Sequence, residues 1–321
     1  MPDPSPAPPQ DPFRFDRPLA PDGYVWWYVD ALSDDGQHGL TLIAMLGTVF
    51  SPYYAWARRR GPADPLQHCA LNAALYGATG RRWAMTERDA GAVERTARRL
   101  RIGPSAVGWD GRLLIIDIDE RTAPLPRALR GQVRVEVPAL AQGDAIALDA
   151  AGRHHWRPIA PVARVSVEMQ APELRWSGAA YVDSNWGSRP LEADFAGWTW
   201  ARAAHAAGTT VTYDVAPLQG TPRSIALRFD AQGVRTEFTP PPLAALRRSG
   251  WGVPRRTRCD AGARPVVVET LEDGPFYARS LIDTRHAGEP LREIHESLSL
   301  TRFASRWVQV LLPVRMPRRR S

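Results

Sequence analysis

Short apolar segments bounded by turn residues follow one another along most of this chain. Residues 23–32 (GYVWWYVDAL), 40–50 (LTLIAMLGTVF) and 112–120 (RLLIIDIDE) are rich in aromatic, branched or alternating apolar residues. Such segments form antiparallel strands, because these side chains fit a pleated surface and Gly, Asp and Pro allow the chain to reverse between them. The pattern predicts a mostly β protein made of antiparallel barrels or sandwiches, with few short helices.

The first 20 residues do not share this pattern. They are rich in proline, which disfavours both strand pairing and helix, so we expect residues 1–20 to be a disordered lead-in. The remainder is predicted to form two β domains, over residues 21–160 and 161–321, the second ending in a basic tail. Residues 87–103 (ERDAGAVERTARRLRIG) are the best candidate for a helix, with Gly103 just past its end.

The charge of the chain is basic but dispersed. The formal net charge is +7 and no lysine occurs, while 34 acidic residues are spread through the sequence. A nucleic-acid binder concentrates its basic residues on one stripe, so we expect no nucleic-acid partner. The chain has no run of about 18 apolar residues and no secretory leader, which predicts a cytoplasmic protein, soluble or peripheral to a membrane.

Few sequence signals support a metal or a nucleotide. No Gly-rich phosphate loop, GxSxG or HExxH motif occurs. His154 and His155 point to opposite faces if they lie on a strand, so both rings cannot bind one metal ion, and we expect no metal site. Cys69 and Cys259 lie far apart and are expected to be reduced thiols.

Aromatic rings and acids occur together in four segments. These are residues 26–30 (WWYVD), 181–187 (YVDSNWG), 198–202 (WTWAR) and 213–214 (YD). Alternate residues of a strand share a face, so Trp198 and Trp200 are expected to lie together. A pocket lined by rings with a few polar groups suits a long apolar ligand. The alternatives are core packing for the rings and a turn or capping role for Asp183 and Asp214.

These segments resemble the carotenoid 1,2-hydratase family, also called hydroxyneurosporene synthases. The resemblance covers nearly the whole chain in the family's order. It runs through residues 23–60, 68–77, 81–88, 113–120, 175–202, 212–215 and 295–319. It implies two lipocalin-like β-barrel domains and a reaction in which water adds to the terminal double bond of an acyclic carotenoid, giving a tertiary alcohol.

The resemblance also implies partners and surroundings. The usual substrates are neurosporene and lycopene in photosynthetic purple bacteria, and no cofactor takes part. Because carotenoids dissolve in membranes, we expect peripheral association with the inner or intracytoplasmic membrane. A non-catalytic carrier of a carotenoid or another isoprenoid is the alternative, since a fold does not fix a function.

Protonation of an alkene requires an acid that holds its proton at neutral pH, and burial raises the pKa of a carboxyl group. We predict that Asp214 is the proton donor, with Tyr213 beside it. Asp183 is the second candidate and Asp30 the third. The predicted substrate-binding residues are mostly aromatic, and desolvated rings stabilise a carbocation. They are Trp186, Trp198, Trp200, Trp27, Tyr28, Ser184 and Asn185.

Ser184 stands where relatives in the wider fold group often have His, so we expect it to orient water and not to act as a base.

Residues 307–314 (WVQVLLPV) are followed by Arg315, Arg318, Arg319 and Arg320. This segment is predicted either to dock on an anionic membrane or to be an ordinary last strand with a solvated tail.

Overall fold

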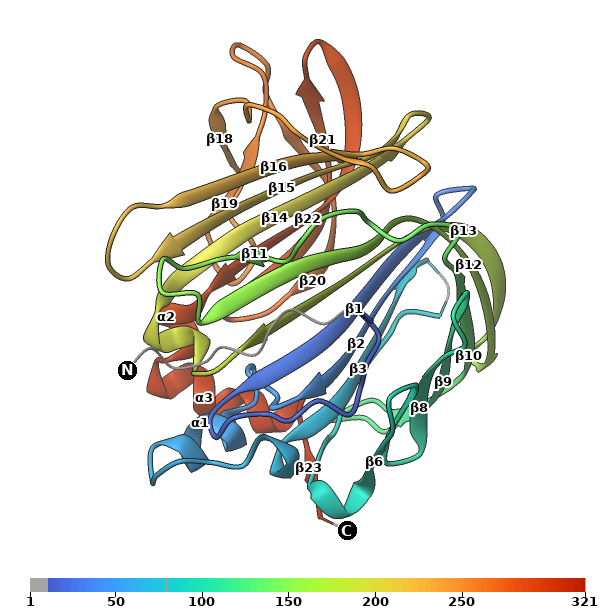
Figure 1. The fold of residues 1–321 in the computed structure, drawn as a ribbon, viewed down its shortest axis with the longest axis vertical. Coiled ribbons are helices and arrows are strands. Elements are labelled where there is room, and N and C mark those ends of the chain that lie inside the picture. Colours follow the sequence, from blue (N-terminus) through green and yellow to red (C-terminus); the bar gives the residue numbers. More distant parts are fainter. Residues whose placement is uncertain (1–10, 79, 321) are drawn as a thin grey trace. The chain divides into compact units, whose positions relative to one another are not determined.

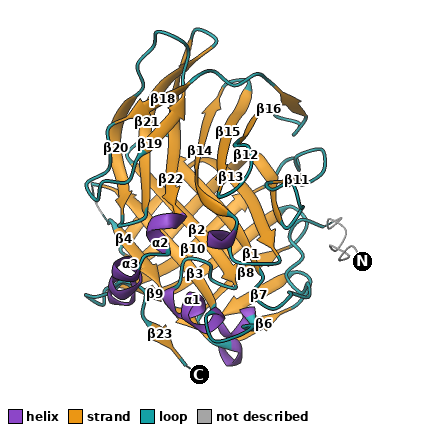
Figure 2. Ribbon diagram, turned by 90° about the vertical axis from the view of Figure 1, so that its left-hand side faces the viewer, coloured by secondary structure: helices purple, strands orange, loops and turns teal. Residues whose placement is uncertain are grey.

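The fold is built almost entirely from antiparallel strands, as Figures 1 and 2 show. The structure, a computed structural model, describes residues 11–78 and 80–320. The predicted mostly β class is confirmed. Contacts divide the chain into unit 1, Met1–Pro190 with Val310–Ser321, and unit 2, Leu191–Gln309. This boundary lies later than residue 160, because the long hairpin of β12 (His154–Ala171) and β13 (Glu173–Gly187) belongs to the sheet of unit 1.

Unit 1 contains a 14-stranded sheet among the described residues. Its main path runs β23-β5-β3-β2-β1-β13-β12-β10-β9-β8-β7-β6, and β4 and β11 pair beside it. The remaining strands of unit 1 are β1 (Tyr24–Ser33), β2 (His38–Leu46), β3 (Cys69–Gly77), β4 (Arg82–Met85), β5 (Glu87–Arg88), β6 (Val93–Arg95), β7 (Arg99–Ile102), β8 (Ser105–Trp109), β9 (Leu113–Arg121), β10 (Ala128–Glu136), β11 (Ile146–Ala147) and β23 (Arg318–Arg319).

One face of this sheet encloses the hydrophobic core of unit 1. Val25, Trp27 and Val29 alternate along β1 and all belong to this core. The segment before β1 completes it, because Phe13 and Phe15 are buried and their rings lie 4.3 Å and 4.7 Å from the rings of Trp109 and Trp27. The disorder predicted for residues 1–20 therefore does not apply to residues 11–20, and residues 1–10 lie outside the described part.

The predicted helix over residues 87–103 is wrong. The segment contains β5, a short 3-10 helix at Ala90–Ala92, β6 and β7. Leu100 and Ile102 are buried with a period of two, which is the period of a strand. Gly103 has a positive φ of 62° and lies between β7 and β8 instead of ending a helix.

Unit 2 contains a seven-stranded sheet in the order β17-β16-β15-β14-β22-β21-β20, and a separate pair of β18 and β19. The strands are β14 (Phe195–His205), β15 (Gly208–Pro217), β16 (Arg223–Phe229), β17 (Arg235–Glu237), β18 (Leu243–Leu246), β19 (Arg255–Arg258), β20 (Val266–Asp273), β21 (Tyr277–His286) and β22 (Glu289–Ser299). Neighbouring strands of the main sheet are antiparallel throughout.

The described helices are few and short (Figure 2). They are α1 (Pro52–Arg58), α2 (Leu300–Phe303), α3 (Arg306–Leu311) and 3-10 helices at Pro65–Gln67, Ala90–Ala92, Leu191–Ala193 and Leu312–Val314. Residues 307–314 are therefore helical and do not form a last strand. None of the described helices has the length and hydropathy needed to cross a membrane.

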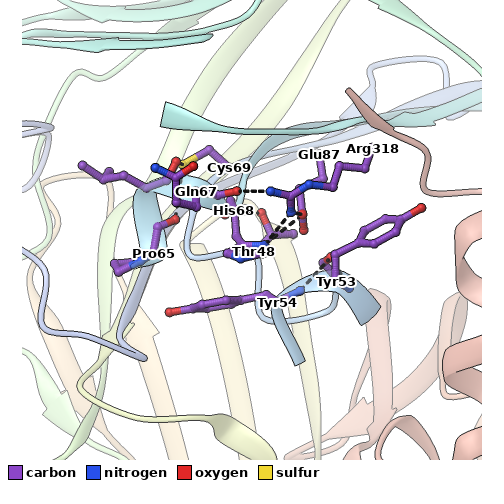
Figure 3. Close-up of polar contacts among 11 residues, drawn as sticks. Thr48, Tyr53, Tyr54, Pro65, Gln67, His68, Cys69, Glu87 and Arg318 are labelled. Carbon is purple, nitrogen blue, oxygen red and sulfur yellow. Dashed lines mark hydrogen bonds and ion pairs between the residues drawn. The ribbon is translucent and has the colours of Figure 1, made fainter. Parts of the chain in front are cut away.

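The basic C-terminal segment contacts unit 1 through β23. Strand β23 pairs with β5 in parallel, and Arg318 forms an ion pair with the buried carboxylate of Glu87. The same guanidinium lies 2.8 Å from Nδ1 of His68 and donates to the carbonyl of Gln67 over 3.0 Å (Figure 3). Arg318 is thus a structural residue of unit 1.

Both cysteines are free thiols buried in the protein. Burial raises the pKa of the Cys69 thiol to about 12, so this group remains protonated at neutral pH. The structure thus agrees with the predicted pair of reduced cysteines.

We expect Phe15→Ala to lower the free energy of unfolding by about 3–5 kcal/mol, because it leaves a cavity beside Trp27. Urea unfolding monitored by circular dichroism measures the change. Arg14→Ala is the control, since this neighbouring side chain is exposed and the substitution should leave stability nearly unchanged. Equal effects of the two substitutions would show that residues 11–20 do not complete the core.

Candidate active site

The face of the β1–β13 pair that lies opposite the hydrophobic core carries two tyrosine–aspartate pairs. Tyr28 stands opposite Asp183 in the register, and Asp30 stands opposite Tyr181. Directly opposed residues of an antiparallel pair point to the same face, so the four side chains form one cluster. We call these four residues the acid cluster.

Asp183 is buried and hydrogen bonded to two neighbouring rings. The indole Nε1 of Trp156, on the adjacent strand β12, donates to its Oδ2 over 2.8 Å. The hydroxyl of Tyr181 donates to the same oxygen over 3.1 Å. Both donors are neutral, so they orient the carboxyl group without adding a positive charge.

Asp30 repeats this arrangement on the neighbouring strand. It is fully buried, and the hydroxyl of Tyr28 donates to its Oδ2 over 2.8 Å. The rings of Tyr28 and Tyr181 lie edge to face with centroids 6.4 Å apart. Two buried carboxyl groups and two phenol rings therefore share a small area of one sheet face.

Asn185 extends the acid cluster along β13. It stands opposite Trp26 on β1 and Trp156 on β12, and it is buried. Among the described residues no group accepts a hydrogen bond from its Nδ2. A buried amide N–H without an acceptor is costly, so this atom is a candidate contact for a water molecule or a substrate.

The end of the same face holds a histidine–tyrosine pair. The Nδ1 atom of His154 lies 2.9 Å from the hydroxyl of Tyr24, and the two rings are stacked. A Cβ atom at Gly187 would lie 2.7 Å from both side chains, so only glycine fits there. His155 stacks instead on Trp186, which confirms that the two adjacent histidines point to opposite faces.

Three of the predicted substrate-binding residues point away from the acid cluster. Trp27 lies in the core of unit 1, and Trp186 packs against this core. Ser184 donates from its hydroxyl to the carbonyl of Trp26 over 2.7 Å. The alternation of β1 and β13 thus leaves Tyr28, Asp183 and Asn185 on the face of the acid cluster and removes these three residues from it.

Unit 2 divides its predicted residues in the same way. Trp200 stands opposite Tyr213, and Trp198 lies next to them on the same face, with its ring 6.2 Å from that of Tyr213. Asp214 stands opposite Thr199 and points to the other face. The structure therefore brings the two tryptophans and the tyrosine together and separates them from Asp214.

Asp214 is engaged in an ion pair. The guanidinium of Arg258 donates from Nε to both carboxylate oxygens, over 3.1 Å and 3.0 Å, and also from a terminal nitrogen. The hydroxyl of Ser224 donates to Oδ1 over 2.6 Å. The carboxyl group of Asp214 therefore contacts a guanidinium and a hydroxyl.

Glu293 is a buried acid that the sequence interpretation missed. It lies on the Asp214 face of unit 2, where burial raises the pKa of its carboxyl group to about 8. Its Oε1 lies 3.5 Å from Nε2 of His286, and Thr257 donates to its Oε2 over 3.5 Å. The directly opposed residue on β21 is the buried Ile282, so both polar and apolar side chains surround this carboxyl group.

The sequence interpretation also missed Trp156 and Tyr181 as partners of an acid. Tyr181 could have been found, because it lies two residues from Asp183 and therefore on its face. Trp156 comes from another strand and carried no such signal. Within the described residues, no group of three or more His, Cys, Asp or Glu side chains is placed to hold a metal ion.

The sequence of this chain is similar to those of known proteins. A family model described as carotenoid hydratase CrtC matches residues 42–321. The acyclic carotenoid 1,2-hydratase of Thiocapsa roseopersicina is 58% identical over 306 residues, which cover 95% of this chain and 75% of that protein. The enzyme of the same name from Rubrivivax gelatinosus is 48% identical over 311 residues, covering 95% and 76%.

Two solved structures have a similar fold. A putative AttH from Nitrosomonas europaea superposes with a TM-score of 0.55 at 15% identity, covering 90% of this chain and 99% of that one. Kievitone hydratase from Nectria haematococca superposes with a TM-score of 0.53 at 10% identity, covering 90% and 98%. At such low identities the likeness concerns the fold alone.

The titration of Glu293 predicts a pH dependence of stability. Its pKa is about 8 in the folded protein against an ordinary 4.5, so the folded state keeps a proton that the unfolded chain releases. Stability therefore falls as pH rises towards 8. Below pH 6.5 His295 has the opposite effect on stability, because burial lowers its pKa to about 4 and the unfolded chain binds the additional proton. Burial lowers the pKa of His286 as well. The net fall is expected between pH 6.5 and 8.

Glu293→Gln should remove this fall, because an amide does not titrate. Urea unfolding at several pH values between 6.5 and 8 provides the measurement. The control is Glu289→Gln, an exposed acid on the same strand, which should behave as the unchanged protein does. If the free energy of unfolding of Glu293→Gln fell with pH as much as that of the control, Glu293 would not be the titrating group.

Proposed function

The chain belongs to the carotenoid hydratase family, and we propose that it adds water to the terminal double bond of an acyclic carotenoid such as neurosporene or lycopene. The product is a tertiary alcohol at the carbon that carries the two methyl groups. The observation that most supports this chemistry is Asp183, a buried carboxyl group held by the neutral donors Trp156 and Tyr181.

Asp183 is the proton donor in this proposal. Its hydrogen bonds to Trp156 and Tyr181 fix the carboxyl group beside two aromatic rings. Asp30 lies diagonally across the strand pair, and a proton on Asp183 removes the repulsion between two buried carboxylates. Asp214, our first candidate from the sequence, is the weaker choice because of its ion pair with Arg258.

The reaction starts when Asp183 transfers its proton to the less substituted carbon of the terminal double bond. The π electrons form the new C–H bond, and the dimethyl carbon becomes a tertiary cation. The faces of nearby rings stabilise such a cation by about 2 kcal/mol each when water is excluded. Tyr28 and Tyr181, both buried beside the two acids, are placed for this role.

Water then attacks the cation and completes the addition. The water oxygen forms the C–O bond, and the proton that it releases returns to the Asp183 carboxylate, which restores the acid. We assign the positioning of this water to the Nδ2 group of Asn185, since it is buried without an acceptor two residues from Asp183. Ser184, expected to orient water, points to the opposite face.

The net reaction neither oxidises nor reduces the carotenoid. We therefore infer that it needs no redox cofactor, and that carotenoid and water are its only reactants. Because a polyene of this kind dissolves in lipid, the protein is proposed to act from the cytoplasm at the surface of the inner or intracytoplasmic membrane. Turnover distinguishes this hydratase from a carrier, which would bind the carotenoid without changing it.

Asp183→Asn is expected to lower the rate of hydration by about 10²- to 10⁴-fold, because an amide cannot donate the proton. The measurement is incubation of lycopene in detergent micelles with the purified protein in H₂¹⁸O, followed by mass spectrometry of the product. Asp214→Asn is the matched control, and its rate per folded protein should stay near that of the unchanged chain.

The reverse result, with Asp214→Asn inactive and Asp183→Asn active, would return the donor role to Asp214. Retention of full rate by both variants would remove both assignments. If the unchanged protein bound lycopene without incorporating ¹⁸O, the carrier function would replace the enzyme.

We expect Tyr181→Phe to reduce the rate while leaving the fold intact, because it removes one hydrogen bond to Asp183 and keeps the ring. Comparison of initial rates and of urea unfolding curves separates the two effects. The control is Tyr76→Phe, which removes a hydroxyl that donates to Thr41 on the same sheet. Equal losses of rate in both variants would deny Tyr181 a specific role.

A further inference from the structure

A pocket of about 110 Å³ lies near the start of β1 and the end of β13 in unit 1. Its walls are mostly apolar, and Phe15, Trp27 and Trp186 supply aromatic rings. None of the four residues of the acid cluster lines this pocket. Two of the rings predicted to bind the substrate, Trp27 and Trp186, therefore belong to a separate pocket.

The segment before β1 forms one wall of the pocket and is held in place by hydrogen bonds. The indole Nε1 of Trp27 donates to the carbonyl of Pro12 over 3.0 Å. The guanidinium of Arg95, on β6, donates to the carbonyl of Arg17 over 2.6 Å and to that of Phe15 over 3.4 Å. The wall is therefore formed before any ligand binds, which lowers the entropic cost of binding.

The charge of the pocket comes from three arginines. Arg14, Arg17 and Arg153 line it, and no acid does so among the described residues. Arg14 is neutralised by an ion pair with Asp16, and Arg153 by one with Asp149. Arg17 forms no ion pair within residues 11–78 and 80–320, so its charge is left without a partner.

The guanidinium of Arg17 is only partly satisfied. One terminal nitrogen donates to the backbone carbonyl of Asp11 over 2.8 Å, whereas the buried Nε has no acceptor in the described part of the chain. The carboxylate of Asp11 accepts from the backbone N–H of Phe13 over 3.0 Å instead. Burial lowers the pKa of Arg17 to about 10, against the opposing effect of Asp11 and Asp16, so the side chain remains charged at neutral pH. A partly buried cation with an unused N–H favours an anionic ligand.

A second unused nitrogen belongs to the lining of the same pocket. The Nδ1 atom of His155 is buried, and no described residue forms a hydrogen bond with it. The imidazole is stacked on Trp186, with the two ring centroids 5.2 Å apart. Burial lowers the pKa of this imidazole below its usual 6.5, so the ring is neutral at pH 7 and can donate a hydrogen bond from Nδ1.

We propose that this pocket binds an aromatic carboxylate. The carboxylate accepts hydrogen bonds from Nε of Arg17 and Nδ1 of His155, and the ring of the ligand packs against Phe15 and Trp186. Hydrogen bonds between a guanidinium and a carboxylate are about twice as strong as those between neutral groups. A neutral apolar molecule would leave both nitrogens without an acceptor, which is costly at a buried position.

The size of the pocket limits the buried part of the ligand to one ring. A closed apolar cavity of roughly 150 Å³ encloses benzene. The present pocket is smaller, but some of its lining residues, such as Pro18 and Ser188, are exposed. A single ring can therefore enter while the rest of the ligand remains near the surface.

Saturation-transfer NMR with benzoate and the full chain tests this site. The unchanged protein should bind benzoate more tightly than benzamide, which has the same ring and no charge. Arg17→Gln should weaken benzoate binding about tenfold, because a hydrogen bond between charged groups is lost. The same variant should bind benzamide as the unchanged protein does, which would show that the pocket is intact. The matched control is Arg112→Gln, an exposed arginine of unit 1 outside the pocket.

His155→Phe provides a second test, since it keeps a ring beside Trp186 and removes the nitrogen. It should weaken benzoate binding about fivefold. Failure of the unchanged protein to bind benzoate, equal affinities for benzoate and benzamide, or equal affinities of R17Q and R112Q for benzoate would each overturn the carboxylate site. The binding assay contains no carotenoid, so its outcome is independent of the hydration assay that tests the proposed function.

Discussion

The register between β1 and β13 is the constraint on which the candidate site depends. It places Tyr28 opposite Asp183 and Tyr181 opposite Asp30, so that two acids and two phenols meet on one face. A slip of one residue would turn every side chain of one strand to the other face and would bring aspartates into the hydrophobic core. The same register therefore holds the core together and assembles the chemistry, and neither can change without the other.

The two faces of this sheet carry out different tasks. The core face is filled by side chains such as Val25, Trp27 and Val29, together with Phe13 and Phe15 from the segment before β1. The opposite face keeps polar groups buried, and the side-chain hydrogen bonds of Asp30, Asp183 and His154 join acids, hydroxyls, an indole and an imidazole. A buried polar group is stable only when its bonds are satisfied, so these contacts both maintain the fold and orient the groups that we assign to catalysis.

Much of this arrangement could be predicted from the sequence, and the missing part has a physical explanation. The strands and the shared face of Trp198 and Trp200 follow from composition and a period of two. A period of two also places the adjacent residues Tyr213 and Asp214 on opposite faces, although we expected them to act side by side. Trp156 and Arg258 could not be found, because they lie 27 and 44 residues from the acids that they contact and their registers are set by tertiary packing. The helix predicted over residues 87–103 is absent, because tertiary packing outweighs the local helix propensity of this segment.

The pairing of β23 with β5 bears on the order in which the protein matures. Strand β5 is translated early, whereas Arg318 leaves the ribosome only after all of unit 2 has been made. Until then the carboxylate of Glu87 lacks this guanidinium, and one edge of the first sheet lacks its neighbouring strand. Unit 2 is continuous in sequence and can therefore fold during synthesis. Unit 1, whose synthesis begins first, is thus completed last. A nascent chain stalled before residue 318 would leave the edge of its sheet at β5 without β23.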